Sequence, residues 1–101
     1  METKFEEIIN SEKPVLIDFF ATWCGPCKMM HPVLEELHKL VGDKARIIKI
    51  DIDKNQDLAA KYNVRSVPTL MIFKNGELAW RESGYKPVAD LEAVLNQYID
   101  Q

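Results

Sequence analysis

Apolar residues along the chain occur in short, nearly continuous runs and in longer stretches where they recur every three or four positions. Residues 15–21 form a run that is almost entirely apolar, β-branched and aromatic, which predicts a strand buried on both faces. Residues 45–52 predict a second buried strand, and residues 69–73 predict a third. An Asn-Gly pair follows and favours a tight hairpin turn, so the chain is expected to return as a fourth strand through 78–83.

Helical spacing flanks and separates these strands. It predicts helices over four segments, which are about 3–11, 24–41, 57–62 and 87–99. Thr3 and Glu6 form a capping box at the start of the first helix. Gly42 is placed to end the second helix, and Pro87 to open the last.

The order of these elements predicts an α/β fold. Because helices separate the first three strands, we expect those strands to be parallel neighbours joined by right-handed crossovers. The last two strands form an antiparallel hairpin. The predicted architecture is a central mixed sheet of four to five strands with helices on both faces. A length of 101 residues fits one domain, which we assign to residues 1–101.

Composition narrows the classes of function. The net charge is −3, without the basic excess of a nucleic-acid-binding protein. No apolar run approaches the roughly 18 residues of a membrane span. The first residues have neither the basic nor the apolar region of a secretory leader, so we expect a cytoplasmic protein. Export stays open if Met1 follows a leader that has been removed.

The two cysteines, Cys24 and Cys27, are the strongest candidates for chemistry. A disulfide across so short a loop would stabilise the fold little, because the entropic effect grows with loop length. The pair lies where a buried strand ends and a helix begins. The free N–H groups and dipole of that helix would favour the Cys24 thiolate and lower the pKa of this thiol. Cys24 could then attack a partner's disulfide, and Cys27 could resolve the mixed disulfide.

The alternatives for this pair are two buried cysteines without a chemical role, a metal site or haem attachment. Structural zinc normally has four protein ligands, and His31 and His38 are the only other His or Cys residues in the chain. His38 is a further seven positions along the helix, or about 10 Å from His31. We therefore expect no metal. Covalent haem is excluded because Lys28, rather than histidine, follows Cys27.

Asp18 is a carboxylate in the middle of the first apolar run. Its burial would be costly unless the group is paired or protonated, and desolvation would raise its pKa. The alternative is a carboxylate that is satisfied at the end of a strand.

The sequence resembles the thioredoxin family over essentially its whole length. The residues that carry the resemblance are Phe19 to Lys28 with the Trp-Cys-Gly-Pro-Cys motif, Pro32, Lys49, Val67-Pro68-Thr69, Asn75-Gly76 and Gly84. The resemblance implies the thioredoxin fold and a general protein-disulfide reductase that acts through Cys24 and Cys27. It also implies that no cofactor is bound, that NADPH supplies electrons through a flavin-containing thioredoxin reductase, and that the substrates are disulfide-containing proteins. We expect a monomer.

The resemblance also assigns roles around the cysteines. Asp18 would be the buried proton acceptor for Cys27, with Lys49 as its cationic neighbour, although Lys49 taken alone would be placed on the solvent face of a strand. Pro68 would be cis and pack against the cysteines, whereas base rates alone favour a trans proline at the start of an edge strand. The implied substrate-docking surface consists of Trp23, Gly25, Pro26, Val67, Pro68 and Gly84. For Trp23, a half-buried packing role is the alternative.

Two residues depart from the usual family pattern. Phe20 stands where many members have tryptophan, a change that should affect packing more than chemistry. His31 stands where a small apolar residue is common, and it either tunes the Cys27 region or is a plain surface residue of the helix.

Two other functions stay open. The first is a specialised or exported thiol–disulfide oxidoreductase with a dedicated partner, although Pro26 between the cysteines favours the reducing direction. The second is a binding module in which the thiols are incidental.

Overall fold

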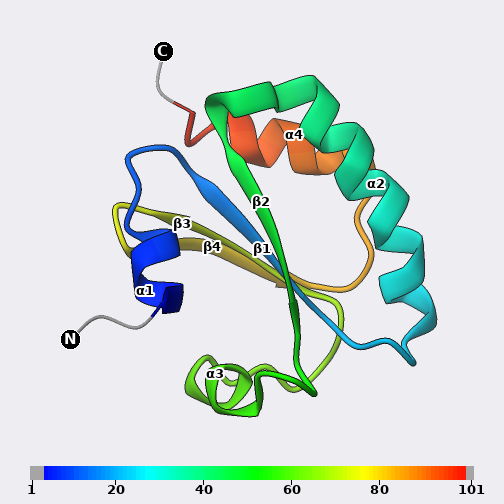
Figure 1. Ribbon diagram of the computed structural model, residues 1–101. Coiled ribbons are helices and arrows are strands. Elements are labelled where there is room, and N and C mark those ends of the chain that lie inside the picture. Colours follow the sequence, from blue (N-terminus) through cyan, green and yellow to red (C-terminus); the bar gives the residue numbers. More distant parts are fainter. Residues whose placement is uncertain (1–3, 100–101) are drawn as a thin grey trace.

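The computed structural model describes residues 4–99. These residues form four strands and four α-helices, with a short 3-10 helix between α2 and β2 (Figure 1). In chain order the elements are α1 (Lys4–Ile9), β1 (Val15–Phe20), α2 (Gly25–Val41), the 3-10 helix (Gly42–Lys44), β2 (Arg46–Asp51), α3 (Gln56–Lys61), β3 (Thr69–Lys74), β4 (Glu77–Ser83) and α4 (Val88–Asn96). The expected order of elements is confirmed, and Thr3 of the expected capping box lies outside the described residues.

The four strands form one mixed sheet in the order β2-β1-β3-β4. β1 pairs with β2 in parallel, while β3 runs antiparallel to both β1 and β4. The expectation that the first three strands are parallel is therefore wrong for β3. The connection from β2 to β3 contains the short helix α3 and does not return along the strands to their starting edge. The chain instead re-enters the sheet where β1 and β2 end, and Thr69 at the start of β3 pairs with Phe19 near the end of β1.

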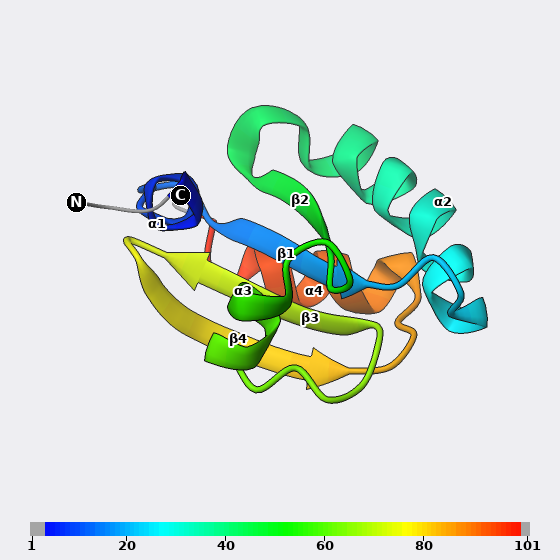
Figure 2. The same cartoon turned by 60° about the horizontal axis from the view of Figure 1, so that its bottom comes forward.

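Helices cover both faces of the sheet, as expected (Figure 2). Alternate side chains of β1 point to opposite faces. Leu16 joins a cluster with residues of α2 and α4, whereas Ile17 and Phe19 join a cluster that includes Phe5 of α1 and has Leu58 of α3 packed against it. The central strands β1 and β3 are therefore buried from both sides, which holds their ends in fixed positions.

The edge of the sheet is more exposed than the sequence suggested. Residues 45–52 were expected to form a buried strand, but Ile50 is the only buried residue within β2. β2 has a neighbour on one side only, so its other edge and several of its side chains face solvent. This exposure places Lys49 at the surface next to a buried strand.

The chain ends its last helix earlier than predicted. α4 stops at Asn96, although Tyr98 and Ile99 still pack against the cluster under α2 and α4. In the hairpin turn between β3 and β4, Asn75 and Gly76 have φ values of 54° and 81°, as a tight Asn-Gly turn requires. Within residues 4–99, no helix combines the length and apolar character needed to cross a membrane.

Candidate active site

Cys24 and Cys27 form a disulfide at the start of α2. Cys24 is the N-cap of this helix and has an extended backbone, and its Sγ accepts a hydrogen bond of 3.1 Å from the backbone N–H of Cys27. Cys27 is fully buried, whereas Cys24 retains 5% of its surface. Of the two cysteines, Cys24 is therefore the one that a substrate can approach. In the reduced state, the same N–H would stabilise a thiolate on Cys24.

The loop before β3 packs directly against this pair. The Val67–Pro68 peptide bond is cis, which confirms the expected isomer. The carbonyl oxygen of Val67 lies 3.6 Å from Sγ of Cys24. The backbone N–H of Gly84, just after β4, donates a 2.8 Å hydrogen bond to the carbonyl oxygen of Pro68. These contacts place the proline loop and Gly84 on the same side of the molecule as the cysteines.

The surface around the cysteines is open. Gly25 and Pro26 are exposed, and Gly84 is half-buried. A Cβ built on Gly25 or on Gly84 would have no other atom within 4 Å. A polypeptide could therefore approach the accessible sulfur closely over these backbone positions.

Trp23 is 68% exposed, so the half-buried packing role considered for it is wrong. Its indole N–H donates a 3.0 Å hydrogen bond to Oδ2 of Asp53, which follows β2. Asp53 was absent from the residues that the sequence singled out. The predicted parallel pairing of β1 and β2 could have pointed to Asp53. Parallel strands end at the same edge of a sheet, so the loops that follow them lie close together.

Asp18 is fully buried, and within the described residues neither carboxyl oxygen has a hydrogen-bond partner. Burial raises the pKa of Asp18 to about 6, and the charge of Lys49 opposes this rise. Lys49 is the register partner of Asp18 on β2. It is exposed, as its own position in the sequence suggested, and it is also the cation next to Asp18 that the resemblance implied.

His31 is half-buried. Its ring meets Phe20 edge to face, with 5.3 Å between the ring centroids and 84° between the planes. Its Nδ1 atom is buried and has no hydrogen-bond partner among the described residues. Burial, and secondarily the charge of Lys49, lower the pKa of His31, while Glu35 acts in the opposite direction. His38, by contrast, is exposed.

The described residues contain no group of three or more His, Cys, Asp or Glu side chains that could hold a metal ion. The reactive atoms of the site are the two sulfurs of the Cys24–Cys27 disulfide. A disulfide at a helix N-terminus, with one accessible sulfur beside the backbone of a proline loop, defines a thiol–disulfide oxidoreductase.

Comparisons with known proteins support this class. The family model described as Thioredoxin matches residues 1–97. The chain is 52% identical over 90 residues to a thioredoxin of Bacillus subtilis, covering 89% of this chain and 86% of that protein. It is 43% identical over 99 residues to a thioredoxin of Haemophilus influenzae, covering 97% of this chain and 92% of that protein. Among solved structures, a single-site mutant of a thioredoxin from Halobacterium salinarum matches with a TM-score of 0.89 and 38% identity, covering 100% of this chain and 88% of that one.

The chain therefore belongs to the thioredoxin family. It has the thioredoxin fold, and its Cys24–Cys27 disulfide is the redox-active group of a dithiol–disulfide oxidoreductase with protein-disulfide reductase activity.

Proposed function

We propose that Cys24 is the nucleophile and Cys27 the resolving residue of a general protein-disulfide reductase. The Cys24 thiolate attacks one sulfur of a substrate disulfide, forms a mixed disulfide and releases the other substrate sulfur as a thiolate. The Cys27 thiolate then attacks Sγ of Cys24, which restores the intramolecular disulfide and releases the second substrate thiolate. The observation that carries this assignment is the difference in exposure, because Cys24 is the N-cap of α2 and retains 5% of its surface, whereas Cys27 has none exposed.

Asp18 is the proposed proton acceptor for the second step. The buried Cys27 thiol transfers its proton to the Asp18 carboxylate, directly or through water, before the sulfur attacks Cys24. The pKa of about 6 supports this role, since most Asp18 side chains are ionised at neutral pH and are stronger bases than an ordinary carboxylate. Lys49 is proposed to limit the rise of this pKa and so keep Asp18 ionised at neutral pH.

Substrate docking is proposed to use backbone groups around the cysteines. Backbone groups of Val67 would hydrogen-bond an extended substrate segment in the manner of strand addition. The open surface at Gly25 and Gly84 supports close approach of that segment. Trp23, Pro26 and Pro68 would complete the surface.

The proposed partners are disulfide-containing proteins and a flavin-containing thioredoxin reductase that passes on electrons from NADPH. A related solved structure, 37% identical with a TM-score of 0.85, concerns the thiol resolving mechanism of a yeast mitochondrial 1-Cys peroxiredoxin via glutathione/thioredoxin systems. That statement applies to the relative and supports the general type of partner. The single domain over 1–101, the monomeric state and the cytoplasmic location stay predictions.

Trapping experiments test the two cysteine roles. Reduced Cys27→Ser protein should accumulate a mixed disulfide with insulin through Cys24, whereas Cys24→Ser protein should accumulate none. A mixed disulfide that forms only through Cys27 would reverse the assignment. The reduction potential tests the direction of transfer. A value near −270 mV, the established figure for thioredoxin itself, supports a reductase, and one near about −180 mV would favour the specialised oxidising or isomerising alternative.

A further inference from the structure

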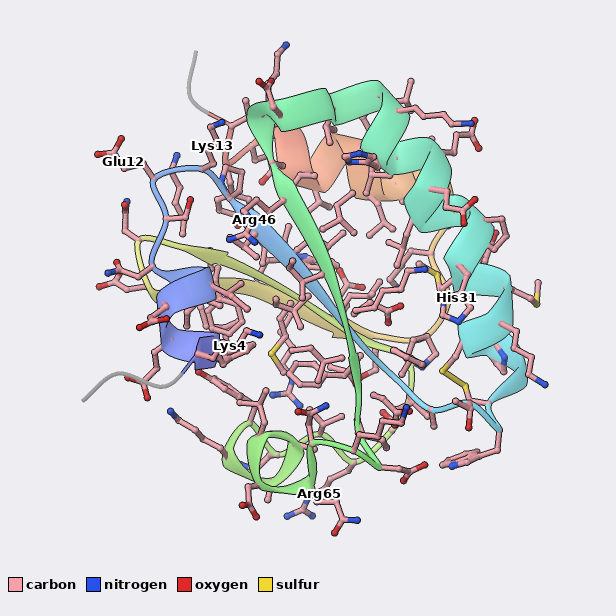
Figure 3. The ribbon with its side chains drawn as sticks, viewed as in Figure 1. Lys4, Glu12, Lys13, His31, Arg46 and Arg65 are labelled. Carbon is pink, nitrogen blue, oxygen red and sulfur yellow. A yellow bond between two sulfur atoms is a disulfide. The ribbon has the colours of Figure 1, made fainter. Side chains whose placement is uncertain are left out.

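His31 lies on the same side of strand β1 as Asp18, the proposed proton acceptor. It follows Cys27 by four positions on α2 and therefore shares the helix face of the resolving cysteine. Figure 3 shows His31 on α2, near the yellow disulfide bond. Its ring contacts Phe20, which is two positions after Asp18 on β1 and therefore points to the same face of the sheet. The imidazole thus lies on the side of β1 that carries the buried carboxylate.

The charged groups around His31 come from three elements. Glu35, one turn further along α2, and Lys49 of β2 act on the pKa of His31, while Asp18 lies on the same face of β1 as Phe20, which His31 contacts. Lys49 acts electrostatically on both His31 and Asp18, so the two groups lie within the field of one ammonium. Glu35 and Lys49 also line a shallow groove between α2 and the edge strand β2. Solvent in this groove reaches Lys49, whose charge acts on Asp18, and Glu35, whose charge acts on His31.

We propose that His31 is a positioning residue for the resolving step, acting on Asp18 by gaining a proton as the solution becomes acidic. This inference rests on the proposed role of Asp18. At neutral pH the imidazole is neutral, and Lys49 is the cation next to the carboxylate. In mildly acidic solution the imidazolium adds a second positive charge on the same face. That charge stabilises the ionised carboxylate, so Asp18 still accepts the Cys27 proton at a pH where it would otherwise be protonated.

The proposal makes the carboxyl group of Asp18 and the imidazole of His31 a coupled pair, with Lys49 acting on the pKa of both. The pKa of Asp18 is raised to about 6, and that of His31 is lowered from 6.5. Near that pH, gain of a proton by the imidazole favours loss of a proton by the carboxyl group. The Nδ1 atom of His31 is buried and has no hydrogen-bond partner among the described residues, so no other contact there explains its position.

The test compares His31→Gln with His38→Gln, which removes an exposed histidine from the same helix. In the reduced full-length protein, the midpoint of the Asp18 carboxyl-carbon NMR titration should rise by about half a pH unit in His31→Gln. The acid limb of insulin reduction should move by the same amount. His38→Gln should leave both unchanged. Placing His31→Gln in an Asp18→Asn background should cause no further shift of the rate profile.

Coupling must also be reciprocal, which provides a measurement in case His31→Gln fails to fold. The His31 imidazole titration should move to lower pH in Asp18→Asn, because the neighbouring negative charge is lost. An unchanged His31 midpoint would overturn the proposal, as would superimposable profiles of wild type and His31→Gln. If Asp18→Asn itself leaves the rate profile unchanged, the proposed role of Asp18 has failed. If Asp18→Asn changes the rate profile but His31→Gln does not, Asp18 keeps its proposed role and His31 has none.

Discussion

Lys49 and Asp18 are opposite one another across the parallel pair β1–β2, so an exposed ammonium neighbours a carboxylate with no exposed surface. Such a pair is asymmetric. Burial raises the pKa of Asp18, and Lys49 reduces that rise without forming a hydrogen bond to either carboxyl oxygen. The position of Lys49 on an edge strand makes this possible, because the ammonium keeps its hydration while its charge still acts on the interior.

Replacing Lys49 by methionine should raise the pKa of Asp18 above about 6, because the favourable charge of Lys49 is removed. The acid limb of insulin reduction should move to higher pH, and activity at neutral pH should fall by about two- to fivefold. Carboxyl-carbon NMR of Asp18 and the pH–rate profile measure the two effects. Lys44→Met, at the far end of α2 from the cysteines, should change neither. An Asp18 midpoint that stays near 6 in Lys49→Met would show that Lys49 has no electrostatic role.

Asp18 should also make the stability of the fold depend on pH. Its folded pKa of about 6 exceeds the ordinary value of 3.8, so between these values the folded state holds a proton that the unfolded chain has lost. Stability should therefore fall as the pH rises through this window, by up to about 3 kcal/mol. Above this pH range the buried, ionised carboxylate lowers the stability of the fold by a constant amount.

Asp18→Asn removes this cost, so the oxidised variant should be more stable than wild type at neutral pH, with a gap that narrows toward about pH 4. Urea denaturation at both pH values measures the gap. Glu36→Gln, an exposed acid on α2, should show no comparable change. A gap that is equal at both pH values would mean that titration of Asp18 is not its cause.

The sequence predicted the elements and the cysteine chemistry well because these depend on local features. Apolar periodicity marks strands and helices, and the position of Cys24 between a strand and a helix determines its place at the N-cap. Antiparallel β3 was missed because strand direction depends on the edge of the sheet at which the β2–β3 connection re-enters, which periodicity does not report. The exposure of β2 and the Trp23–Asp53 hydrogen bond were missed because both depend on strand order. Pro68 was predicted as cis from the resemblance, against the base rate for its residue type.

Asp53 should orient Trp23 for contact with protein substrates. Asp53→Ala removes the acceptor of the indole N–H, which leaves an exposed ring free to rotate. Because the bond is exposed, its loss should cost about 1 kcal/mol or less. Reduction of insulin should then show a KM several-fold higher with little change in kcat, and reduction of the small disulfide DTNB should be unaffected. Trp23 fluorescence anisotropy, measured in a Trp80→Phe background, should decrease. Equal losses toward insulin and DTNB would indicate damage to the cysteine pair instead.

Gly84 should be required for its backbone conformation, with Gly25 as the matched control. Both glycines lie in open space, so an added Cβ would collide with no atom at either position. Gly84 alone of the two has a positive φ, 97°, which side chains of L-residues rarely adopt. Gly84→Ala should therefore cost about 1–2 kcal/mol, whereas Gly25→Ala, in the first turn of α2, should be neutral or slightly stabilising.

Thermal and urea unfolding of the two oxidised variants measure this difference directly. Gly84 also donates its N–H to the carbonyl oxygen of Pro68. If the backbone at position 84 moves to relieve the strain of an L-alanine, it should therefore shift the proline loop beside Cys24. Gly84→Ala should then reduce insulin turnover more than DTNB turnover, because only the protein substrate needs the backbone of that loop. Replacement of Gly84 by D-alanine through semisynthesis should restore stability, since a D-residue favours positive φ. Equal destabilisation by the L- and D-residues would show that the added methyl group, rather than the left-handed conformation, causes the loss.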